Sequence, residues 1–438
     1  MSQIGGTYGE FELSRQDWRR IGIAMGIMVL WNGITWGFPF FWDTILNSRI
    51  AHWYVDSNMG SWTVPESLDA GHPPFFSRYL AMIWTVFGKS LAISHIAMLP
   101  FLLTIVVQVY KLGKRCLKPE MLPWVLLVLC LEPTFLAQSS MITPDIALIC
   151  FYLLGLNAIL EGKRFVLGAA MVCMAAMTFR GILIVPALFL SDVALGYWQG
   201  KRKPDWRKIL PYLPVSILVA LWLYIHYKAV GWLLSPPAET YGAHREMVGL
   251  SGIVRNIAIT GWRWLDYGRV AVWLFVGVAA LWTWRKGLLS HKMVRLMVFM
   301  GLPAIWLTLL FVPFSNPIGH RYYTVCYLIL GIITLGFVQE IKARVQKLVL
   351  SAGMALVLIS GHFWIYPDHI AQGWDASLAH VRYFGLRNQM DQYVLENEIS
   401  MSDVCSDFPL LSKTKYTHVA LKASPANYVD KFEIGFNN

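Results

Sequence analysis

Groups suited to acid–base chemistry gather in one early loop of an otherwise apolar chain. Asp43 directly follows the aromatic stretch 36–42, and the same loop carries Glu66, Asp69 and His72. A carboxylate at an apolar boundary is costly unless it is solvated or paired. At Asp43 such a group suits a general base that takes a proton from a hydroxyl or an amine. The alternative is that Asp43 caps the following helix, because Asp is favoured at helix N-caps.

A second acid, Asp145, follows Thr143 and Pro144. This order is typical of a helix start, with Thr143 as the N-cap and Pro144 at the first helical position. Asp145 then lies in the first turn, where the helix dipole favours an anion. These preferences explain Asp145 as a structural residue. We also expect it on the same membrane face as Asp43, as a shared site requires.

His72 precedes two prolines, which push it into an extended conformation. A histidine here could contact a phosphate, bind a metal or transfer a proton, although a lone loop histidine is more often simply solvated. Asp69 and Glu66 are near enough in sequence to complete a metal site, but their spacing is not diagnostic of one. A divalent metal is therefore compatible with this loop and not required by it.

Two arginines are predicted at the same membrane edge as these acids. Arg180 lies between two very apolar stretches, and Arg321 opens a late one between His320 and Tyr322. Arginine suits phosphate because its planar guanidinium gives bidentate contacts with a permanent charge. Arg180 and Arg321, with His320 and Tyr322 beside them, are thus candidates to hold a lipid-linked phosphate. The alternative is that both arginines snorkel to lipid headgroups.

The elements that must position these residues are membrane spans. Of 438 residues, 56% are hydrophobic and only 14% are charged, whereas soluble domains carry about 25% charged residues. The polar start leads into the first span without a small-residue cleavage site, which indicates a retained signal anchor. We expect an all-α polytopic membrane protein with about eleven spans, at 19–40, 90–110, 121–137, 143–160, 164–179, 182–198, 209–227, 268–284, 296–313, 321–340 and 346–366.

The net charge of +11 raises nucleic acid as a partner, but its distribution argues against one. The basic residues lie in short loops between spans, without an aromatic and basic stripe that tracks nucleic acid. Short basic loops are typical of the cytoplasmic side of a membrane. Residues 1–18 are then cytoplasmic, and loops 41–89 and 228–267 face the other side. His244 belongs to a polar cluster in the second loop, and its place in the site is open.

The last segment, 367–438, reads as a small extracytoplasmic α/β domain after the membrane domain 19–366. Residues 375–396 show helical spacing of apolar positions, and short strands are predicted near Val404, at 418–421 and at 432–434. So few residues bury only a marginal core. We therefore expect this segment to dock on the outer loops. None of the six cysteines forms a CxxC pair, so neither a zinc knuckle nor a disulfide framework is indicated.

The order of these elements resembles the GT-C membrane glycosyltransferases. The similarity is to the phospholipid carrier-dependent branch, related to protein O-mannosyltransferases and the lipid A aminoarabinose transferase. It consists of one span followed by an acid, a loop ending in a basic residue before Pro-Pro, an amphipathic stretch into Phe-Gly-Lys-Ser, and a Pro-Asp that opens the fourth span. It is strongest over residues 20–200 and weaker to about residue 340.

This resemblance implies transfer of a sugar from a polyprenyl-phosphate donor to a lipid, glycan or protein acceptor. The reaction would take place on the extracytoplasmic face, which in a bacterium is the periplasmic side of the inner membrane. It implies Asp43 as the base, Asp145 as a second acid, His72 in place of a basic residue and Arg321 near the donor phosphate.

Two positions depart from the family pattern. Thr44 stands where many members have a second acid, and Gly71 stands where the aminoarabinose transferases have a glutamate that binds metal. Two other functions stay open. A transporter or flippase of lipid-linked sugars would need polar groups near the membrane midplane and paired repeats, and no repeat is visible. A non-catalytic scaffold of the same fold would be consistent with the missing second acid.

Overall fold

The computed structural model describes residues 12–198, 208–233, 245–315, 318–364, 366, 373, 375–399, 412 and 414–419. Within these residues the chain is helical, and its only bridge between extended segments joins Met247 and Phe314. The α-helices are α1 (Arg15–Thr35), α2 (Thr44–Asp56), α3 (Phe75–Phe87), α4 (Leu91–Ile96), α5 (Leu99–Cys116), α6 (Leu122–Leu131), α7 (Pro133–Ser139), α8 (Pro144–Glu161), α9 (Arg164–Met177), α10 (Phe179–Trp198), α11 (Leu213–Val230), α12 (Leu250–Leu265), α13 (Arg269–Arg285), α14 (His291–Phe311), α15 (Thr324–Val338), α16 (Arg344–Ser360), α17 (Val381–Glu396) and α18 (Thr414–Thr417).

Every predicted span overlaps one of these helices, but fewer than eleven are both long and apolar enough to cross a membrane. Among the described residues seven helical segments meet that condition, or up to nine if each of two bent pairs counts as one span. The bent pairs are 119–131 with 133–139, at 61°, and 250–265 with 269–285, at 86°. Helix α9 is too short to meet the length condition, and α1 is not among the helices that meet both the length and the hydropathy conditions. The protein is nevertheless a polytopic integral membrane protein.

The predicted outer loop 228–267 is only partly a loop. Helix α12 occupies Leu250–Leu265 and leads into α13 after a sharp bend. The sequence indicated no span here because α12 is amphipathic, with exposed apolar side chains such as Leu250 and Val254 and polar Asn256 buried. The pair 164–179 and 182–198 does form two helices, since Thr178 between them is fully extended.

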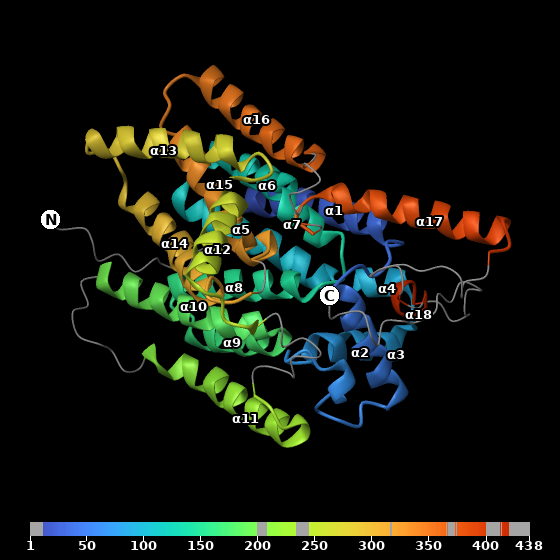
Figure 1. Ribbon diagram of the computed structural model, residues 1–438. Coiled ribbons are helices and arrows are strands. Elements are labelled where there is room, and N and C mark those ends of the chain that lie inside the picture. The colour runs from blue at the N-terminus through green and yellow to red at the C-terminus, as the bar shows by residue number, and fades with distance from the viewer. Residues whose placement is uncertain are drawn as a thin grey trace.

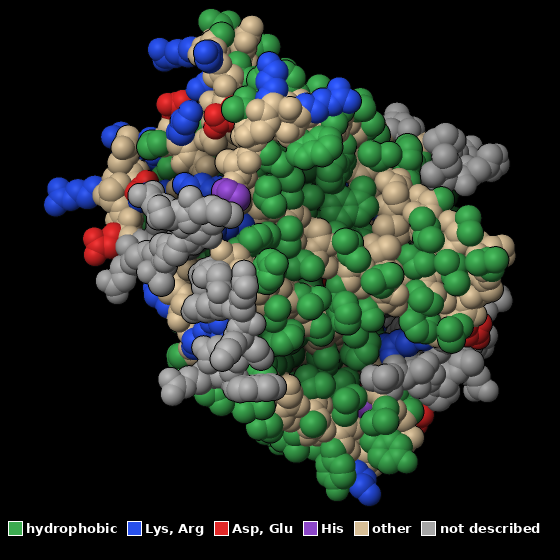
Figure 2. Space-filling model, turned by 90° about the vertical axis from the view of Figure 1, so that its left-hand side faces the viewer, with side chains coloured by type: hydrophobic (Ala, Val, Ile, Leu, Met, Phe, Trp, Pro, Cys, Tyr) green, Lys and Arg blue, Asp and Glu red, His purple; other side chains and the backbone are tan. Residues whose placement is uncertain are grey.

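Helices α8 and α15 form the centre of the bundle (Figure 1). Every residue of α15 is buried, and α8 packs against α5, α9 and α10. The outer helices show the opposite pattern, with large exposed apolar side chains such as Ile217 on α11 and Leu309 on α14. Figure 2 shows a broad field of hydrophobic side chains on one face, with Lys and Arg mainly toward its left and upper edges. A surface of this kind suits contact with lipid.

The two ends of α8 carry different chemistry. At its last turn Glu161 pairs with Lys111 at 2.5 Å, Arg115 at 2.7 Å and Lys163 at 2.8 Å, all from the predicted cytoplasmic loops. At its first turn lies Asp145. The two acids are sixteen positions apart on one helix, about 24 Å at 1.5 Å per residue, which approaches the ~30 Å thickness of a bilayer's hydrocarbon core. Asp145 is therefore at the end of the bundle opposite the basic loops.

The C-terminal segment packs on the first loop, as expected. Aromatic rings of α17 contact Phe41, with centroids 4.8 Å apart for Tyr383 and 5.6 Å for Phe384. Helix α17 covers most of the predicted helix 375–396 and extends away from the bundle, whereas α18 packs against α2 (Figure 1). The strands predicted near Val404 and at 432–434 lie outside the described residues. Of the stretch 418–421, the described residues 418 and 419 follow α18 and form no strand.

Candidate active site

The inner part of the site is an ion pair between two helix starts. Thr143 caps α8, its hydroxyl accepting from the Asp145 N–H at 3.3 Å, with Pro144 in the first turn, as the sequence indicates. The extended Thr178 ends α9, and α10 begins at the next residue, Phe179. Arg180 therefore lies in the first turn of α10. The Arg180 guanidinium lies 2.5 Å from Asp145 Oδ1, and both side chains are largely buried. Two predicted site residues are thus in direct contact.

Asp43 and Arg321 form the outer part. Asp43 begins α2 but makes no side-chain cap, so the capping interpretation is wrong. Its carboxylate instead accepts a hydrogen bond from Arg321 Nη2. The turn before α2 is held by Thr44, whose hydroxyl bonds both the N–H and the carbonyl of Phe41 at 2.8 Å. The Asp43 side chain is 52% exposed, whereas that of Arg321 is only 13% exposed, so Asp43 stays accessible to a substrate.

Arg321 joins the two parts and adds a third acid. Its Nε lies 3.6 Å from Asp145 Oδ2, and its Nη1 lies 3.0 Å from Oδ2 of Asp375. Asp375 comes from the C-terminal segment and is buried. Burial, together with the carboxylates of Asp145 and Asp43, raises the pKa of Asp375 above its usual value, against the opposing effect of Arg321. The site therefore has three carboxyl groups and two guanidinium groups.

Tyr322 forms an aromatic wall beside both cations. The Arg180 guanidinium carbon lies 4.2 Å from the ring centroid, and that of Arg321 lies 5.7 Å from it. Contacts of this kind stabilise cations over aromatic faces and fix the planes of the two guanidinium groups. The arrangement can bind an anion such as a phosphate, in competition with the carboxylates that now hold the arginines.

His72 lies near this cluster, with its side chain exposed at the surface. The surrounding protein, with Arg245 and Arg180 nearby, lowers the pKa of His72 to about 4, and the carboxylates of Asp43 and Asp69 only partly offset this. A neutral imidazole can donate or accept one hydrogen bond. With its pKa lowered, His72 is a weaker source of positive charge than the basic residue that the resemblance implies at this position.

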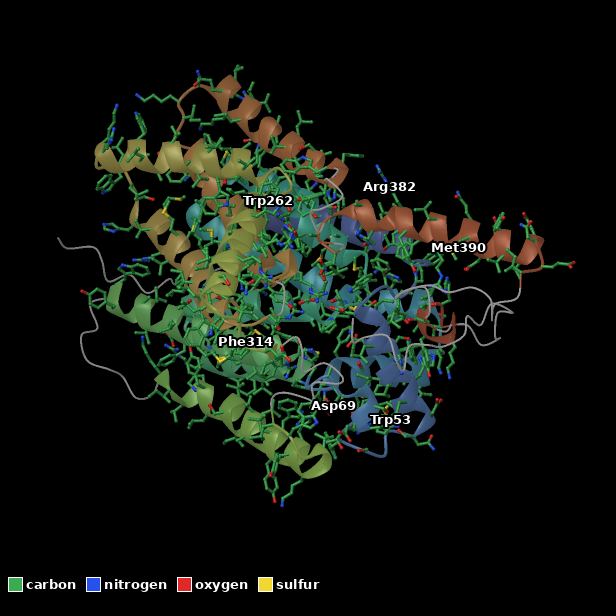
Figure 3. The ribbon with its side chains drawn as sticks, viewed as in Figure 1. Trp53, Asp69, Trp262, Phe314, Arg382 and Met390 are labelled. Carbon is green, nitrogen blue, oxygen red and sulfur yellow. The ribbon has the colours of Figure 1, made fainter. Side chains whose placement is uncertain are left out.

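Asp69 serves the architecture of the first loop. Its Oδ2 lies 2.9 Å from Nε2 of His226 on α11, and its Oδ1 accepts from the Gly71 N–H at 2.7 Å. Figure 3 shows Asp69 between helices α2 and α3 and helix α11. Arg245 donates to the Ala70 carbonyl at 2.8 Å, and a Cβ on Gly71 would come within 2.9 Å of its Nη1. Gly71 has a φ of +72°, a backbone conformation that residues with a side chain rarely adopt, so glycine is favoured here.

His320 lies behind the cluster. Its Nε2 is 2.8 Å from Asp266 Oδ2, and both side chains are fully buried. Asp266 also accepts from the Tyr366 hydroxyl. The ring of His320 limits the space at Gly373, where a Cβ would come within 2.7 Å of Nδ1. His320 is thus engaged in placing the C-terminal segment and does not reach the carboxylates beside its neighbour Arg321.

The first loop was also a candidate metal site. Among the described residues no group of three or more His, Cys, Asp or Glu side chains could hold a metal ion. Asp69 is occupied by His226, Glu66 is exposed on the short 3-10 helix η1 (Glu66–Leu68), and Gly71 offers no ligand. His244 lies outside the described residues. The described residues of the first loop therefore offer no ligand set that fits the metal of the aminoarabinose transferases.

Comparison with known proteins bears on the fold. No family model matches the sequence, and no match is found among curated proteins. The crystal structure of ArnT from Cupriavidus metallidurans bound to undecaprenyl phosphate matches with a TM-score of 0.55, covering 88% of this chain and 73% of that one. The fold is GT-C-like. At 14% sequence identity the likeness concerns the fold, and it confirms the resemblance found in the order of sequence elements at that level.

Within the GT-C-like fold, sequence reasoning missed Asp375 as a site residue and Arg245 and His226 as supports of the first loop. The sequence pattern places Asp375 at the start of a predicted tail helix and assigns it no role in the site. The one feature of the sequence that could have indicated Asp375 as a site residue is its position as an acid in a segment expected to face the same side of the membrane as Asp43. His226 and Asp69 are separated by 157 positions, and no local pattern relates residues so far apart.

Proposed function

We propose that the protein is a membrane glycosyltransferase that moves a sugar from a polyprenyl-phosphate donor to an acceptor on the extracytoplasmic face. The observation that carries this proposal is the pairing of the half-exposed Asp43 with the buried Arg321. A base open to an acceptor then stands next to a cation suited to phosphate. The GT-C-like fold, shared with a protein solved with undecaprenyl phosphate, supports the same donor class.

In the proposed reaction the phosphate of the donor binds at Arg321 and Arg180 and displaces part of their carboxylate contacts. Asp43 takes the proton of the acceptor hydroxyl or amine as that group attacks the anomeric carbon. The bond between the sugar and the phosphate oxygen breaks, and the polyprenyl phosphate leaves with its electron pair. The two guanidinium groups stabilise the charge that develops on the leaving phosphate.

The test is sugar transfer by the purified full-length protein from undecaprenyl phosphate carrying a radiolabelled sugar. A panel of sugars is offered with a membrane extract as the source of acceptor. Asp43→Asn removes the base and should lower the rate ~100- to 10,000-fold, the usual contribution of a general base. Asp56→Asn makes the same change at the far, exposed end of α2 and should leave the rate unchanged. Equal rates in the wild type and Asp43→Asn would refute the assignment.

One observation keeps the transporter alternative in view. The breaks of the two bent helix pairs are joined by a buried ion pair of Glu132 with Arg269, which also bonds Thr134 at 2.6 Å. Broken helices line the sites of many transporters. Here Glu132 and Arg269 neutralise each other at the breaks, and the three acids of the candidate site lie elsewhere. Movement of intact labelled donor across vesicles without sugar release would favour the transporter.

A further inference from the structure

The C-terminal segment delivers an acid that gives the site an excess of negative groups. Asp375 contacts the same guanidinium as Asp43, and Asp145 lies against its third nitrogen. With Arg180 counted, three carboxyl groups face two cations. A lipid phosphodiester adds one more negative charge to this arrangement. Placing a like charge beside buried carboxylates is unfavourable unless one of them becomes neutral or moves away.

Asp375 is poorly placed to move away. Its backbone carbonyl accepts from Gln138 Nε2 at 2.9 Å, and the next carbonyl, of Ala376, accepts from the Thr134 hydroxyl at 3.3 Å. Both donors belong to α7, next to the start of α8. On the other side Gly373 packs on the His320 ring, and its carbonyl accepts from Tyr267 at 3.2 Å. The segment that carries Asp375 is therefore fixed to the bundle on both sides.

The charged and titratable groups around Asp375 come from several elements. Arg321 faces it from the 3-10 helix η6 (His320–Tyr323), Asp43 from the start of α2 and Asp145 from α8. Arg180 lies on the far side of Asp145, and the pair of His320 with Asp266 lies behind Gly373. Of the three acids, Asp145 is held by both arginines and Asp43 is half exposed to water. Asp375 is buried and has one arginine partner among the described residues, which makes it the acid most easily neutralised.

We propose that Asp375 is a positioning residue that takes up one proton when the phosphate of a lipid carrier binds at Arg321. This inference rests on the proposed function and adds to it that binding of the anionic carrier is coupled to proton uptake. The proton comes from solvent, is held on the Asp375 carboxyl while the phosphate occupies the site, and returns to solvent when the phosphate leaves. The neutral acid no longer competes for the guanidinium and can donate its O–H to a phosphate oxygen.

The sign of the coupling follows from the charges. Burial and the other two acids already raise the pKa of Asp375, and a bound phosphate adds a further negative charge that raises it more. Between the pKa of the free protein and that of the complex, the complex holds one more proton. Affinity should therefore rise as the pH falls, by up to about tenfold for each pH unit in that range.

The experiment measures binding of undecaprenyl methyl phosphodiester to the full-length protein in lipid nanodiscs between pH 5 and 8. A diester is used because it carries one fixed charge, whereas a phosphate monoester titrates near pH ~6 and would take up a proton itself. We expect the dissociation constant of the wild type to increase by up to about tenfold for each unit by which the pH is raised. Asp375→Asn should vary less than about twofold over the same range, and the exposed Asp56→Asn should behave like the wild type.

Calorimetry of the wild type in two buffers of different ionisation enthalpy counts the protons directly. This measurement needs no variant and stays decisive if Asp375→Asn fails to fold. Uptake approaching one proton supports the inference, and no uptake overturns it. An equal pH slope in the wild type and Asp375→Asn overturns it as well, while leaving the proposed donor class intact. Failure of the wild type to bind the diester at any pH would instead refute the proposed function.

Discussion

Asp145 Oδ1 lies 2.5 Å from Arg180 Nη1, and only 3% and 13% of the two side chains are exposed. Because the other oxygen of Asp145 faces Arg321, one buried carboxylate orients both cations of the site. A buried ion pair adds little net stability, but removing one partner leaves the other charge uncompensated. We therefore expect substitution of Asp145 to lower the stability of the fold and substitution of Asp43 to lower the rate of the reaction. Measuring both quantities separates the two roles.

Asp145→Asn should lower the free energy of unfolding by ~3–5 kcal/mol, the usual cost of leaving a buried charge without its partner. Asp43→Asn, at a half-exposed position, should change it by less than ~1 kcal/mol. The measurement is denaturant unfolding of each variant in the same detergent micelles. Equal losses for the two variants would show that Asp43 is as structural as Asp145.

Arg321→Lys should weaken binding of undecaprenyl methyl phosphodiester at least ~10-fold, equivalent to ~1.4 kcal/mol. A lysine ammonium is a single point charge and cannot engage several carboxylates and a phosphate through a planar fork. The matched control is Arg382→Lys, on the exposed surface of α17 and labelled in Figure 3. An unchanged affinity in Arg321→Lys would place the phosphate elsewhere.

The stability of the protein should depend on pH through His72. The pKa of His72 is lowered to about 4 in the folded protein, whereas an unfolded histidine titrates near 6.5. The unfolded chain therefore binds more protons within this window, and stability is lost as the pH falls through it. His52 and His380 shift in the same direction, so the informative quantity is the difference between variant and wild type.

We expect His72→Gln to lose less thermal stability than the wild type between pH 7 and pH 4.5, measured by scanning fluorimetry in detergent. Above pH 7 the two proteins should differ by a constant offset, because His72 is neutral there in both the folded and the unfolded state. Parallel curves over the whole range would mean that His72 titrates normally.

Asp69→Asn should loosen the first loop by weakening its contact with His226. A hydrogen bond to a charged group contributes ~1.5–3 kcal/mol, so cleavage within the loop by a protease should become markedly faster. Limited proteolysis followed by mass spectrometry locates the cut. Glu66→Gln, at an exposed position of the same loop, should leave the rate unchanged; faster cleavage in both variants would point to a general loss of loop charge.

Sequence and structure agree where the signal is local. Thr143 and Pro144 predicted the helix start at Asp145 because capping depends on neighbouring residues. The same local preference suggested helix capping as the alternative role of Asp43, which is wrong because its partner Arg321 lies 278 positions away. Asp375 escaped notice for the same reason, since only the folded tail brings it to Arg321. Apolar stretches located the long helices of the bundle, but not α2 and α3 in the first loop, nor α12, whose polar and apolar residues alternate too closely to form an apolar stretch.

Helix α8 joins Asp145 at one end to Glu161 at the other without interruption. The length of this helix therefore sets the distance between Asp145 and the basic residues that surround Glu161. One extra helical turn in α8 would displace Asp145 by about 5.4 Å along the helix axis. It would then lose contact with Arg180 and Arg321, which belong to other helices. A donor lipid reaching from the same bilayer would then meet a split site, so the length of α8 is itself under constraint.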